Sequence, residues 1–457
     1  MANKLMVGIS GVRGIVGEEL TPELCVRLGE AFGTYVDGGK VIVGRDTRPS
    51  GDMVKHAVFA GLLSAGCQII DVGVVGTPTA AMSIRDLKAD GGIVISASHN
   101  TIEWNALKFF RADGVYLNGA QGRALLDIYY GGQAARVGWR DIKAVQFDND
   151  ANARHLRKVL DIVDVKALRK RKFRVALDCA NGAGGALALA FLKEIDAKVS
   201  CLYCEPHGNF SRNPEPTAAN VTEICKVVKR DKCDVGFAQD ADADRIAFIS
   251  EKGAYIGEEY SMCLAAKYIL SRKPGPVVTN LSSSRMIEDV AHEFGCEVVR
   301  TPVGEVNVAE KMIELGAPCG GEGNGGVIDP RVTYGREALT GMALLLQLML
   351  EKKKTVSQLA AEIPSYRFVK TKVACSKRVL APVLEQLAQE KKGHVDTRDG
   401  VKIDFPEGWV HVRASNTEPI VRVYSEARTE TMAKRLNDQY RRLVERTVAA
   451  HSKGEGR

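Results

Sequence analysis

Short apolar runs typical of buried strands alternate with helix-like segments along most of this chain. In its first part, apolar runs at residues 41–43, 69–72 and 92–95 are separated by helix-like stretches at 53–65 and 79–87. Alternation of this kind is typical of α/β layers in which the strands run largely parallel. The sequence therefore predicts an α/β protein.

Two further sets of alternating elements follow a polar, glycine-containing linker at residues 131–150. The second set extends from an apolar run at 173–178 to one at 246–249, and the third from a run at 277–279 to a helix-like stretch at 338–350. Each set is about a hundred residues long, which is close to the usual size of a domain. The three sets look like one architecture used three times.

The pattern changes from about Tyr366 onward. Short alternating runs at 401–404, 409–412 and 420–423 precede a long helix-like segment at 429–449. This order predicts a small α+β domain with an antiparallel sheet. A chain of 457 residues is long enough for about three domains, with two or four also admissible.

Composition favours a globular protein that binds a small anion. The chain is 45% hydrophobic and 26% charged, and its formal charge of +7 is a small imbalance for this length. No long Lys/Arg stripe interleaves with aromatic residues, which argues against nucleic acid as a partner. The arginines lie in short polar loops, where they suit a small anionic ligand.

The sequence predicts neither a membrane span nor a disulfide framework. No secretory signal pattern is present near the start, and the longest apolar stretch, at 343–350, is far too short to cross a bilayer. The 11 cysteines are odd in number and scattered through apolar runs, which fits reduced thiols. Cys201 and Cys204 have CxxC spacing without a second pair at zinc-ribbon distance, so buried strand cysteines are the better interpretation. We therefore expect a cytoplasmic protein.

A strand-like run ends directly in Ala-Ser-His-Asn at residues 97–100, with Lys108 shortly downstream. Open α/β sheets keep their chemistry at the carboxyl ends of their strands, where this run presents the hydroxyl of Ser98. His99 and Lys108 could manage the proton of that hydroxyl and an attached anion. A serine-rich turn without function is the alternative.

Three carboxylates alternate in a second loop, at Asp240, Asp242 and Asp244, and Arg245 follows them. Two unit charges about 4 Å apart repel by roughly 4 kcal/mol at an effective dielectric near 20. A hard divalent cation such as Mg²⁺ or Ca²⁺ would remove that cost. An EF-hand is rejected because its sixth position is Arg245 rather than glycine, whereas a merely solvated acidic turn stays possible.

Two later loops carry groups that suit a phosphorylated sugar. Arg413 and Arg422 flank hydroxyls and an amide that together would cradle a phosphate, with a capped turn as the alternative. The glycine-rich loop at 320–326 lets backbone approach a ligand closely, and Glu322 and Asn324 in it offer partners for sugar hydroxyls. No P-loop element is present.

In this order, the loops resemble those of the α-D-phosphohexomutase superfamily, which includes phosphoglucomutase/phosphomannomutase and phosphoglucosamine mutase. The matching motifs are Ser-Gly-Val-Arg-Gly, Ala-Ser-His-Asn, Asp-x-Asp-x-Asp-Arg, Gly-Glu-Gly-Asn-Gly-Gly and Arg-x-Ser-Asn-Thr-Glu-Pro. The resemblance implies three related α/β domains with mixed sheets and a C-terminal α+β domain around one central cleft. Domain I would span residues 1–150, domain II 151–253, domain III 254–365 and domain IV 366–457.

The resemblance also implies a role for each loop. Ser98 would carry a phosphoryl group beside Mg²⁺, which would be held by Ser98, Asp240, Asp242 and Asp244. The catalytic set would also include His99, Lys108, Arg13 and Arg245, which handle protons and stabilise charge near the phosphoryl group. Glu322 and Asn324 would bind the sugar. The phosphate that does not react would be gripped by Arg413, Ser415, Asn416, Thr417 and Arg422.

The implied reaction interconverts a hexose 6-phosphate and its 1-phosphate through a hexose 1,6-bisphosphate, on a monomer or homodimer. The Gly-Glu-Gly-Asn-Gly-Gly loop favours glucosamine 6-phosphate as the substrate, while Ala414 and Asn416 depart from bacterial phosphoglucosamine mutases. A phosphomannomutase/phosphoglucomutase is therefore the alternative. Thr101, Ala106, Ala241 and Ala243 also depart from the family pattern, but none of them replaces a reacting group.

Two hypotheses of another class remain. An aspartate-based phosphatase would use one of the three aspartates as nucleophile, although it would leave Ser98 without a role. A sugar-phosphate-binding protein without catalysis would not need Ser98, Lys108 and the three aspartates together.

Overall fold

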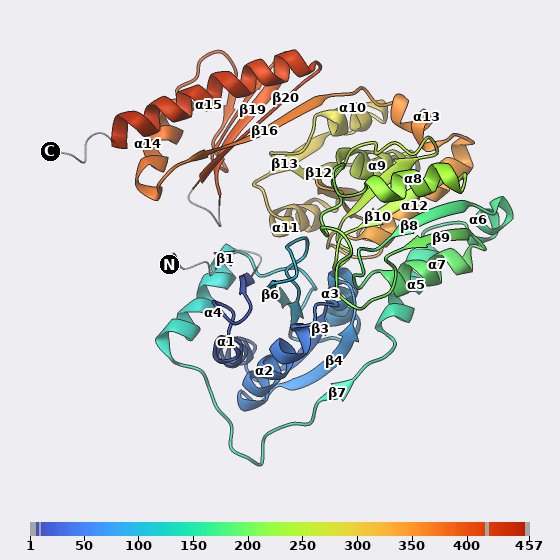
Figure 1. The fold of residues 1–457 in the computed structure, drawn as a ribbon. Coiled ribbons are helices and arrows are strands. Elements are labelled where there is room, and N and C mark those ends of the chain that lie inside the picture. Colours follow the sequence, from blue (N-terminus) through green and yellow to red (C-terminus); the bar gives the residue numbers. More distant parts are fainter. Residues whose placement is uncertain (1–5, 9–10, 416–419, 453–457) are drawn as a thin grey trace.

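Four β-sheets organise the chain in the computed structural model, which describes residues 6–8, 11–415 and 420–452. Each sheet is the centre of one unit, and we number these units as domains I to IV in chain order. In Figure 1 domain I lies at the bottom, domains II and III lie side by side at the right, and domain IV lies at the top left.

Domain I is built on a seven-stranded sheet. In spatial order its strands are β1 (Met6–Gly8), β2 (Gly11–Ile15), β6 (Trp104–Arg111), β5 (Gly91–Ile95), β3 (Lys40–Arg45), β4 (Gln68–Val74) and β7 (Gln146–Phe147). Its helices are α1 (Pro22–Tyr35), α2 (Gly51–Ser64), α3 (Thr77–Asp86) and α4 (Gly119–Gly131). Thr21 caps α1 and Asn118 caps α4 through hydrogen bonds to the free N–H groups of the first turn.

Domains II and III each have a four-stranded sheet. The order in domain II is β11 (Ile246–Ser250), β10 (Val235–Gln239), β8 (Arg174–Asp178) and β9 (Lys198–Leu202), with helices α5 (Ala151–Asp161), α6 (Val165–Arg171), α7 (Gly185–Glu194) and α8 (Thr222–Arg230). The order in domain III is β13 (Val298–Thr301), β12 (Val277–Asn280), β14 (Cys319–Glu322) and β15 (Gly326–Ile328), with helices α9 (Glu259–Arg272), α10 (Met286–Glu293), α11 (Glu305–Leu315), α12 (Ala338–Lys352) and α13 (Val356–Ala361).

One strand arrangement recurs in all three α/β domains, as the sequence predicted. In each, three parallel strands are followed by a fourth that pairs antiparallel with the third: β4-β3-β5-β6, β9-β8-β10-β11 and β13-β12-β14-β15. The predicted serine, aspartate and glycine-rich loops all join the third strand to the fourth. Three loops that look unrelated in sequence therefore occupy one topological position at the carboxyl end of a buried strand.

Domain IV has a five-stranded antiparallel sheet, which confirms the predicted change to an α+β unit. Its strands in spatial order are β16 (Arg367–Ala374), β20 (Ile420–Ala427), β19 (Gly408–Ala414), β18 (Val401–Phe405) and β17 (His394–Asp396), and its helices are α14 (Lys377–Ala388) and α15 (Glu430–Ser452). The helices cover one face of the sheet (Figure 1). Alternate buried residues along β20 pack beneath α15, as expected for a sheet with one covered face.

The apolar cores show which domains form a common body. Domains II and III share one cluster, in which Phe237 and Phe248 of domain II and Leu344 of α12 are all buried. Domain IV has a core of its own, and domain I has one of its own beside a smaller cluster that it shares with Val306 and Ala309 of α11 in domain III. Among the described residues, no helix combines the length and the apolar character needed to span a membrane.

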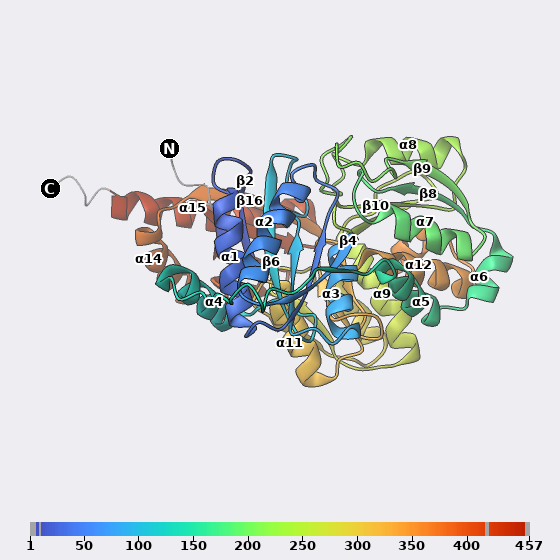
Figure 2. The ribbon, with the colours of Figure 1, turned by 90° about the horizontal axis from the view of Figure 1, so that it is seen from below.

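The linker that the sequence predicted between the first two domains contributes one short strand. Its β7 pairs parallel to β4 through Ile70 and Asp71 and closes the edge of the domain I sheet. The rest has no regular structure, and Trp139 is 78% exposed. Figure 2 shows this segment passing over the helices of domain I toward α5.

Candidate active site

Ser98 lies in the turn directly after β5, and its backbone has a φ of +52°. This left-handed conformation is uncommon for a residue other than glycine and has to be held by its surroundings. The Ser98 N–H donates to Ser96 Oγ at 3.0 Å, and Ser96 Oγ in turn donates to Asp46 Oδ2 at 2.7 Å. Ser98 is buried at the floor of a cleft.

Arg48 holds the serine turn from beneath, a role that the sequence did not reveal. Its buried guanidinium donates to four backbone carbonyls: Ser98 O at 2.8 Å, Asn100 O at 2.8 Å, Thr101 O at 2.6 Å and Trp104 O at 3.1 Å. Its Nε donates to Asp46 Oδ2 at 3.0 Å, so the charge is paired.

The three aspartates between β10 and β11 form a buried cluster whose carboxylate oxygens lie within 4.8 Å of one another. Among the described residues, Oδ1 of Asp242 and Oδ1 of Asp244 are buried without a hydrogen-bond partner. Buried carboxylate oxygens without donors are costly unless a cation satisfies them. The donor set is all oxygen, so the cluster could bind a hard divalent metal ion.

The pKa values of Asp240 and Asp242 in this cluster shift in opposite directions. Burial and the neighbouring carboxylates of Asp244 and Asp242 raise the pKa of Asp240 well above its ordinary value. Burial also acts to raise the pKa of Asp242, but the Lys108 ammonium, 2.6 Å from Asp242 Oδ2, outweighs it and holds that pKa well below its usual range. Besides Lys108, the Arg245 guanidinium acts on this cluster, because its Nε lies 3.7 Å from Asp244 Oδ1.

Ser98 and the aspartates come from different domains and meet in the structure. Ser98 Oγ donates to Asp240 Oδ2 at 3.1 Å, and His99 Nδ1 lies 3.4 Å from the same hydroxyl. The Arg245 guanidinium, together with burial and Arg13, lowers the pKa of His99 well below its ordinary value, so the imidazole is neutral at pH 7. Arg13 itself donates to the Asn100 side chain beside the serine turn.

A second buried arginine, Arg336, joins the aspartate cluster to the glycine-rich loop. Its three nitrogens donate to Asp244 Oδ2 at 2.5 Å, Glu322 Oε2 at 2.8 Å and Glu305 Oε2 at 2.9 Å. Glu322 Oε1 accepts from Asn280 at 2.8 Å and from the Gly304 N–H at 3.2 Å, so its carboxylate has a fixed orientation. No motif in the sequence pointed to Arg336.

The fourth predicted loop is described in part. Arg413 of β19 lies opposite Arg422 of β20, and its Nε donates to Asp399 Oδ2 at 3.1 Å. The Ser415 N–H donates to the Ile420 carbonyl at 2.9 Å. Asn416 and Thr417 lie outside the described residues.

A cleft of about 870 Å³ brings the four loops together, with wall residues from every domain. The predicted residues that line it are Arg13, Ser98, His99, Lys108, Arg245, Glu322, Asn324, Arg413 and Arg422. The three aspartates lie below its floor, and Ser415 does not line it. Sequence reasoning missed further wall residues, namely Tyr116, Glu215, Glu258, Glu259, Glu305, Arg336 and Lys370.

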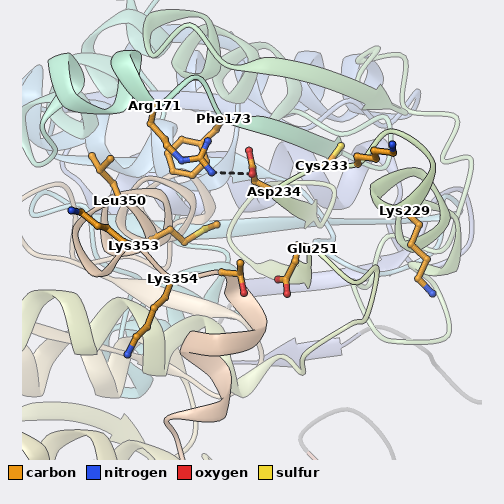
Figure 3. Close-up of a pocket in the computed structure, with 12 residues that line it drawn as sticks. Arg171, Phe173, Lys229, Cys233, Asp234, Glu251, Leu350, Lys353 and Lys354 are labelled. Atoms are coloured by element: carbon orange, nitrogen blue, oxygen red, sulfur yellow. Dashed lines mark hydrogen bonds and ion pairs between the residues drawn. The ribbon is translucent and has the colours of Figure 1, made fainter.

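A second cavity, of about 720 Å³, lies between domains II and III and contains none of these residues (Figure 3). Several of its cations, among them Arg171, Lys229 and Lys353, lie at the C-terminal ends of α6, α8 and α12. Cations are favourable there because they complement the negative end of the helix dipole. The basic character of this cavity is therefore explained without a ligand.

The chain is similar to known proteins over nearly its whole length. Models of phosphoglucomutase/phosphomannomutase domains I, II, III and IV match residues 4–135, 153–253, 258–366 and 369–443. A probable phosphoglucosamine mutase of Methanopyrus kandleri is 39% identical over 446 residues, which are 96% of this chain and 98% of that one. A phosphoglucomutase/phosphomannomutase of Thermococcus kodakarensis is 38% identical over 452 residues, covering 97% and 99%.

Solved structures show the same arrangement of domains. The crystal structure of a phosphoglucomutase/phosphomannomutase family protein from Burkholderia thailandensis superposes with a TM-score of 0.85 at 25% identity, covering 97% of each chain. The match extends over all four sheets and therefore includes the cleft that they surround. The chain belongs to the phosphoglucomutase/phosphomannomutase family of α-D-phosphohexomutases.

Proposed function

We propose that this phosphohexomutase carries its phosphoryl group on Ser98 and interconverts glucosamine 6-phosphate and glucosamine 1-phosphate. The observation that carries the proposal is the 3.1 Å contact between Ser98 Oγ and Asp240, in a cluster with two unpartnered carboxylate oxygens. Phosphoryl transfer needs mainly positioning and neutralisation of charge. A hydroxyl beside a cation site at the floor of a cleft supplies both.

The residues around Ser98 have distinct tasks. Asp240, Asp242 and Asp244 would hold Mg²⁺, which neutralises charge on a phosphoryl group and on its leaving oxygen. Ser98 Oγ lies 3.1 Å from Asp240 Oδ2, so a phosphoryl group on Ser98 would lie beside that ligand set. A phosphoserine carries about −1.5 to −2 charges at neutral pH. Arg13 and Arg245, which line the cleft beside it, would balance the remainder.

His99 is the candidate for proton transfer, because a neutral imidazole next to the Ser98 hydroxyl can accept a proton from a sugar hydroxyl. Lys108 has a different role. Burial acts to lower its pKa, but the Asp242 carboxylate raises it above the ordinary value of a lysine. Lys108 therefore stays protonated and stabilises negative charge at the reacting oxygen.

The other parts of the cleft would hold the sugar and its second phosphate. Arg413 and Arg422, with Ser415, Asn416 and Thr417, would bind the phosphate that does not react, and Glu322 and Asn324 would bind hydroxyls. A hexose 1,6-bisphosphate formed at Ser98 would turn over in the cleft and present its other phosphate. The phosphate-binding site at Arg413 and Arg422 would then bind the phosphate that does not react in both orientations of the ligand.

Glucosamine is favoured over mannose and glucose because residues 321–326 have the Gly-Glu-Gly-Asn-Gly-Gly form that resembles phosphoglucosamine mutases. The acidic residues of the cleft wall are Glu215, Glu258, Glu259, Glu305 and Glu322. Cations of the same wall pair with four of them: Arg245 with Glu215, Lys370 with Glu258, and Arg336 with both Glu305 and Glu322, so these carboxylates do not by themselves select an amino sugar. A phosphomannomutase/phosphoglucomutase is the alternative, and relatives of both names are similar to this chain.

The remaining proposals concern the state of the protein. We propose a monomer or homodimer, which light scattering would measure, and a cytoplasmic location. All 11 cysteines are free thiols in the structure, which suits a reducing compartment. An aspartate-based phosphatase is not favoured, because Asp242 is tied to Lys108 and Thr77 and Ser98 would be idle.

Mass spectrometry and a coupled assay test the proposal together. After incubation with hexose 1,6-bisphosphate, the wild type should gain one phosphoryl mass on Ser98, and Ser98→Ala should lose both this mass and turnover. Ser282→Ala, which removes another hydroxyl of the same cleft, should keep the phosphoryl mass. Turnover by Ser98→Ala, or phosphate trapped on Asp240, would refute the mechanism. Specificity constants for the 1-phosphates of glucosamine, mannose and glucose would decide the sugar.

A further inference from the structure

Three cysteine thiols meet at the end of the domain II sheet. The CxxC pair Cys201 and Cys204 lies at the end of β9, which is the edge strand, and Cys179 directly follows the neighbouring strand β8. Leu177 pairs with Cys201 in the parallel register, and the Cys179 N–H donates to the Leu202 carbonyl at 3.4 Å. Cys179 is buried, Cys204 is half-buried and Cys201 is exposed.

Cys204 is the centre of this group. Its Sγ lies 3.4 Å from the Leu202 carbonyl and 3.7 Å from the Leu177 carbonyl, which places it between the ends of the two strands. The Cys179 N–H donates to the same Leu202 carbonyl, also at 3.4 Å, so Cys179 and Cys204 lie side by side around one acceptor. Neighbouring strands lie about 4.8 Å apart, which is within the Cα spacing that a disulfide can bridge.

Of the three thiols, that of Cys204 is also the one that ionises most readily. The hydrogen bond from the Cys179 thiol lowers the pKa of Cys204, with a further contribution from Cys201. The same contact raises the pKa of Cys179, and burial raises that of Cys201 to about 12. The thiolate is the reactive form of cysteine, so Cys204 would react first with an oxidant that enters from the sheet edge.

Cys179 also begins a loop that braces the active site. In this loop, residues 179–184, the Ala183 N–H donates to the Ala241 carbonyl at 2.8 Å, and Gly182 packs so closely on Ala241 that a Cβ would lie 2.4 Å from its oxygen. Thr47, next to Arg48, donates its hydroxyl to the Asn181 carbonyl at 2.9 Å. The loop thus contacts both the aspartate cluster and the support of the Ser98 turn.

The backbone of the loop at residues 179–184 is conformationally restricted. Ala180 and Asn181 have φ values of +50° and +55°, which residues other than glycine rarely adopt. A disulfide at Cys179 would therefore have to displace a segment whose backbone conformation is restricted. The same segment contacts Ala241 directly.

We propose that Cys179 and Cys204 form a reversible disulfide when hydrogen peroxide oxidises Cys204, and that this bond lowers turnover by displacing the loop at residues 179–184. The Cys204 thiolate attacks the peroxide O–O bond, which gives a sulfenic acid and releases hydroxide, or water after protonation. The Cys179 sulfur then attacks the Cys204 sulfur, the S–O bond breaks, and a second water leaves. Overall, two thiols and one hydrogen peroxide give one disulfide and two waters.

Reduction by a small dithiol reverses the bond through thiol–disulfide exchange. Cytosolic disulfides, where they occur, are usually transient and redox-sensing, so the proposal is compatible with a reducing compartment. The disulfide itself is independent of the proposed sugar specificity, and only its effect on turnover relies on phosphohexomutase activity.

Peptide mapping of the oxidised protein tests the bond. After treatment with hydrogen peroxide and alkylation of the remaining thiols, trypsin should yield residues 175–193 linked to residues 199–212. Turnover of hexose 1-phosphate should fall by about tenfold or more, as expected when catalytic groups shift by an ångström, and should return after dithiothreitol. The link is mapped on the wild type, so it needs no variant that folds.

Two variants sharpen the result. Cys204→Ser should keep its turnover in peroxide, whereas Cys225→Ser, which removes another half-buried thiol of domain II, should lose turnover as the wild type does. Free Cys179 and Cys204 after peroxide treatment would overturn the proposal. A Cys201–Cys204 bond would overturn the pairing, and a Cys179–Cys204 bond with full turnover would overturn the link to activity.

Discussion

Arg48 shows how much a single buried side chain can contribute to a reactive turn. Its guanidinium fixes four carbonyls of the turn, and a lysine offers neither this planar geometry nor as many donors. We expect Arg48→Lys to lower kcat by about 100-fold with little change in KM, because the Ser98 hydroxyl would be misplaced while sugar binding is kept. Steady-state kinetics would measure both constants.

A neighbouring arginine provides the control for this change. Arg45 lies in the same segment but pairs with the exposed Asp52 at 2.8 Å, so Arg45→Lys should leave kcat almost unchanged. A change in KM alone for Arg48→Lys would contradict the role that we assign to it.

Lys402 in β18 gives the protein a pH-dependent stability. Burial lowers the pKa of this lysine to about 7, with Arg300 and Arg285 acting in the same direction and Asp404 and Glu288 opposing them. Between about pH 7 and 10 the unfolded chain therefore binds a proton that the folded chain does not, so stability rises with pH in this window. Below pH 7 the cost of charging the buried amine is fully present.

Lys402→Met tests this sign. The variant should be more stable than the wild type near pH 6, by on the order of 5 kcal/mol, and the advantage should shrink as pH approaches 10. Chemical denaturation would measure this difference in stability. Unfolding of domain IV can be followed by the fluorescence of Trp409, whose ring centroid lies 4.9 Å from the Lys402 amine. A constant difference between the two proteins at every pH would contradict the prediction.

At the scale of elements, the loop between β14 and β15 requires glycine at position 323, because there is no room for a side chain there. A Cβ on Gly323 would lie 2.1 Å from a carboxylate oxygen of Glu259 in α9. Gly323→Ala should therefore displace the loop that holds Glu322 and Asn324. We expect KM for hexose phosphates to rise about tenfold, since lost contacts of roughly 1.4 kcal/mol correspond to that factor, while the phosphoryl mass on Ser98 is kept.

The matched control is Gly122→Ala in α4, where a Cβ meets nothing within 4 Å. Because alanine favours a helix, this change should leave both constants unchanged. An unchanged KM for Gly323→Ala would show that the loop position does not matter for binding.

The loops also show what the sequence could and could not predict. Ser98 and the three aspartates could be located from the sequence because each group follows an apolar strand at its carboxyl end, whereas Glu322 was indicated by the glycines around it. Arg48 and Arg336 could not be located, because their partners lie far along the chain: Ser98 is 50 residues from Arg48, and Asp244 is 92 residues from Arg336. Local patterns carry no information about such contacts.

For the whole molecule, the sequence predicted three repeated α/β units and a different fourth one, which the sheets confirm. The strand in the linker was missed, because two residues leave no periodic pattern. The shared core of domains II and III was also unpredictable, since it depends on how α12 packs between sheets. The roles of Asn416 and Thr417 stay predictions.

Domain IV reaches the cleft through a contact that can be tested. Asp399 accepts from the Val303 N–H of domain III at 2.9 Å and from Arg413 at 3.1 Å, so it ties the distal arginine to the neighbouring domain. Asp399→Asn weakens the charged hydrogen bond to Arg413. We expect KM to rise about tenfold for the 1-phosphates of all three hexoses alike, since the phosphate is common to them.

Kinetics with the three substrates would measure this effect. Asp396→Asn, which alters a pair with the exposed Arg398 in the same domain, should have little effect. A change confined to one sugar would place Asp399 near the sugar ring instead of the phosphate.

Arg336 constrains how this cleft can vary among relatives. Asp244, Glu322 and Glu305 share this one guanidinium, so loss of the arginine alone would remove the ion pairs of Glu322 and Glu305 and leave Asp244 with Arg245 at 3.7 Å. Loss of one carboxylate would likewise leave donors unused. Substitutions at these four positions should therefore covary during divergence, and a lineage that changes its sugar loop at Glu322 should also have changed Arg336.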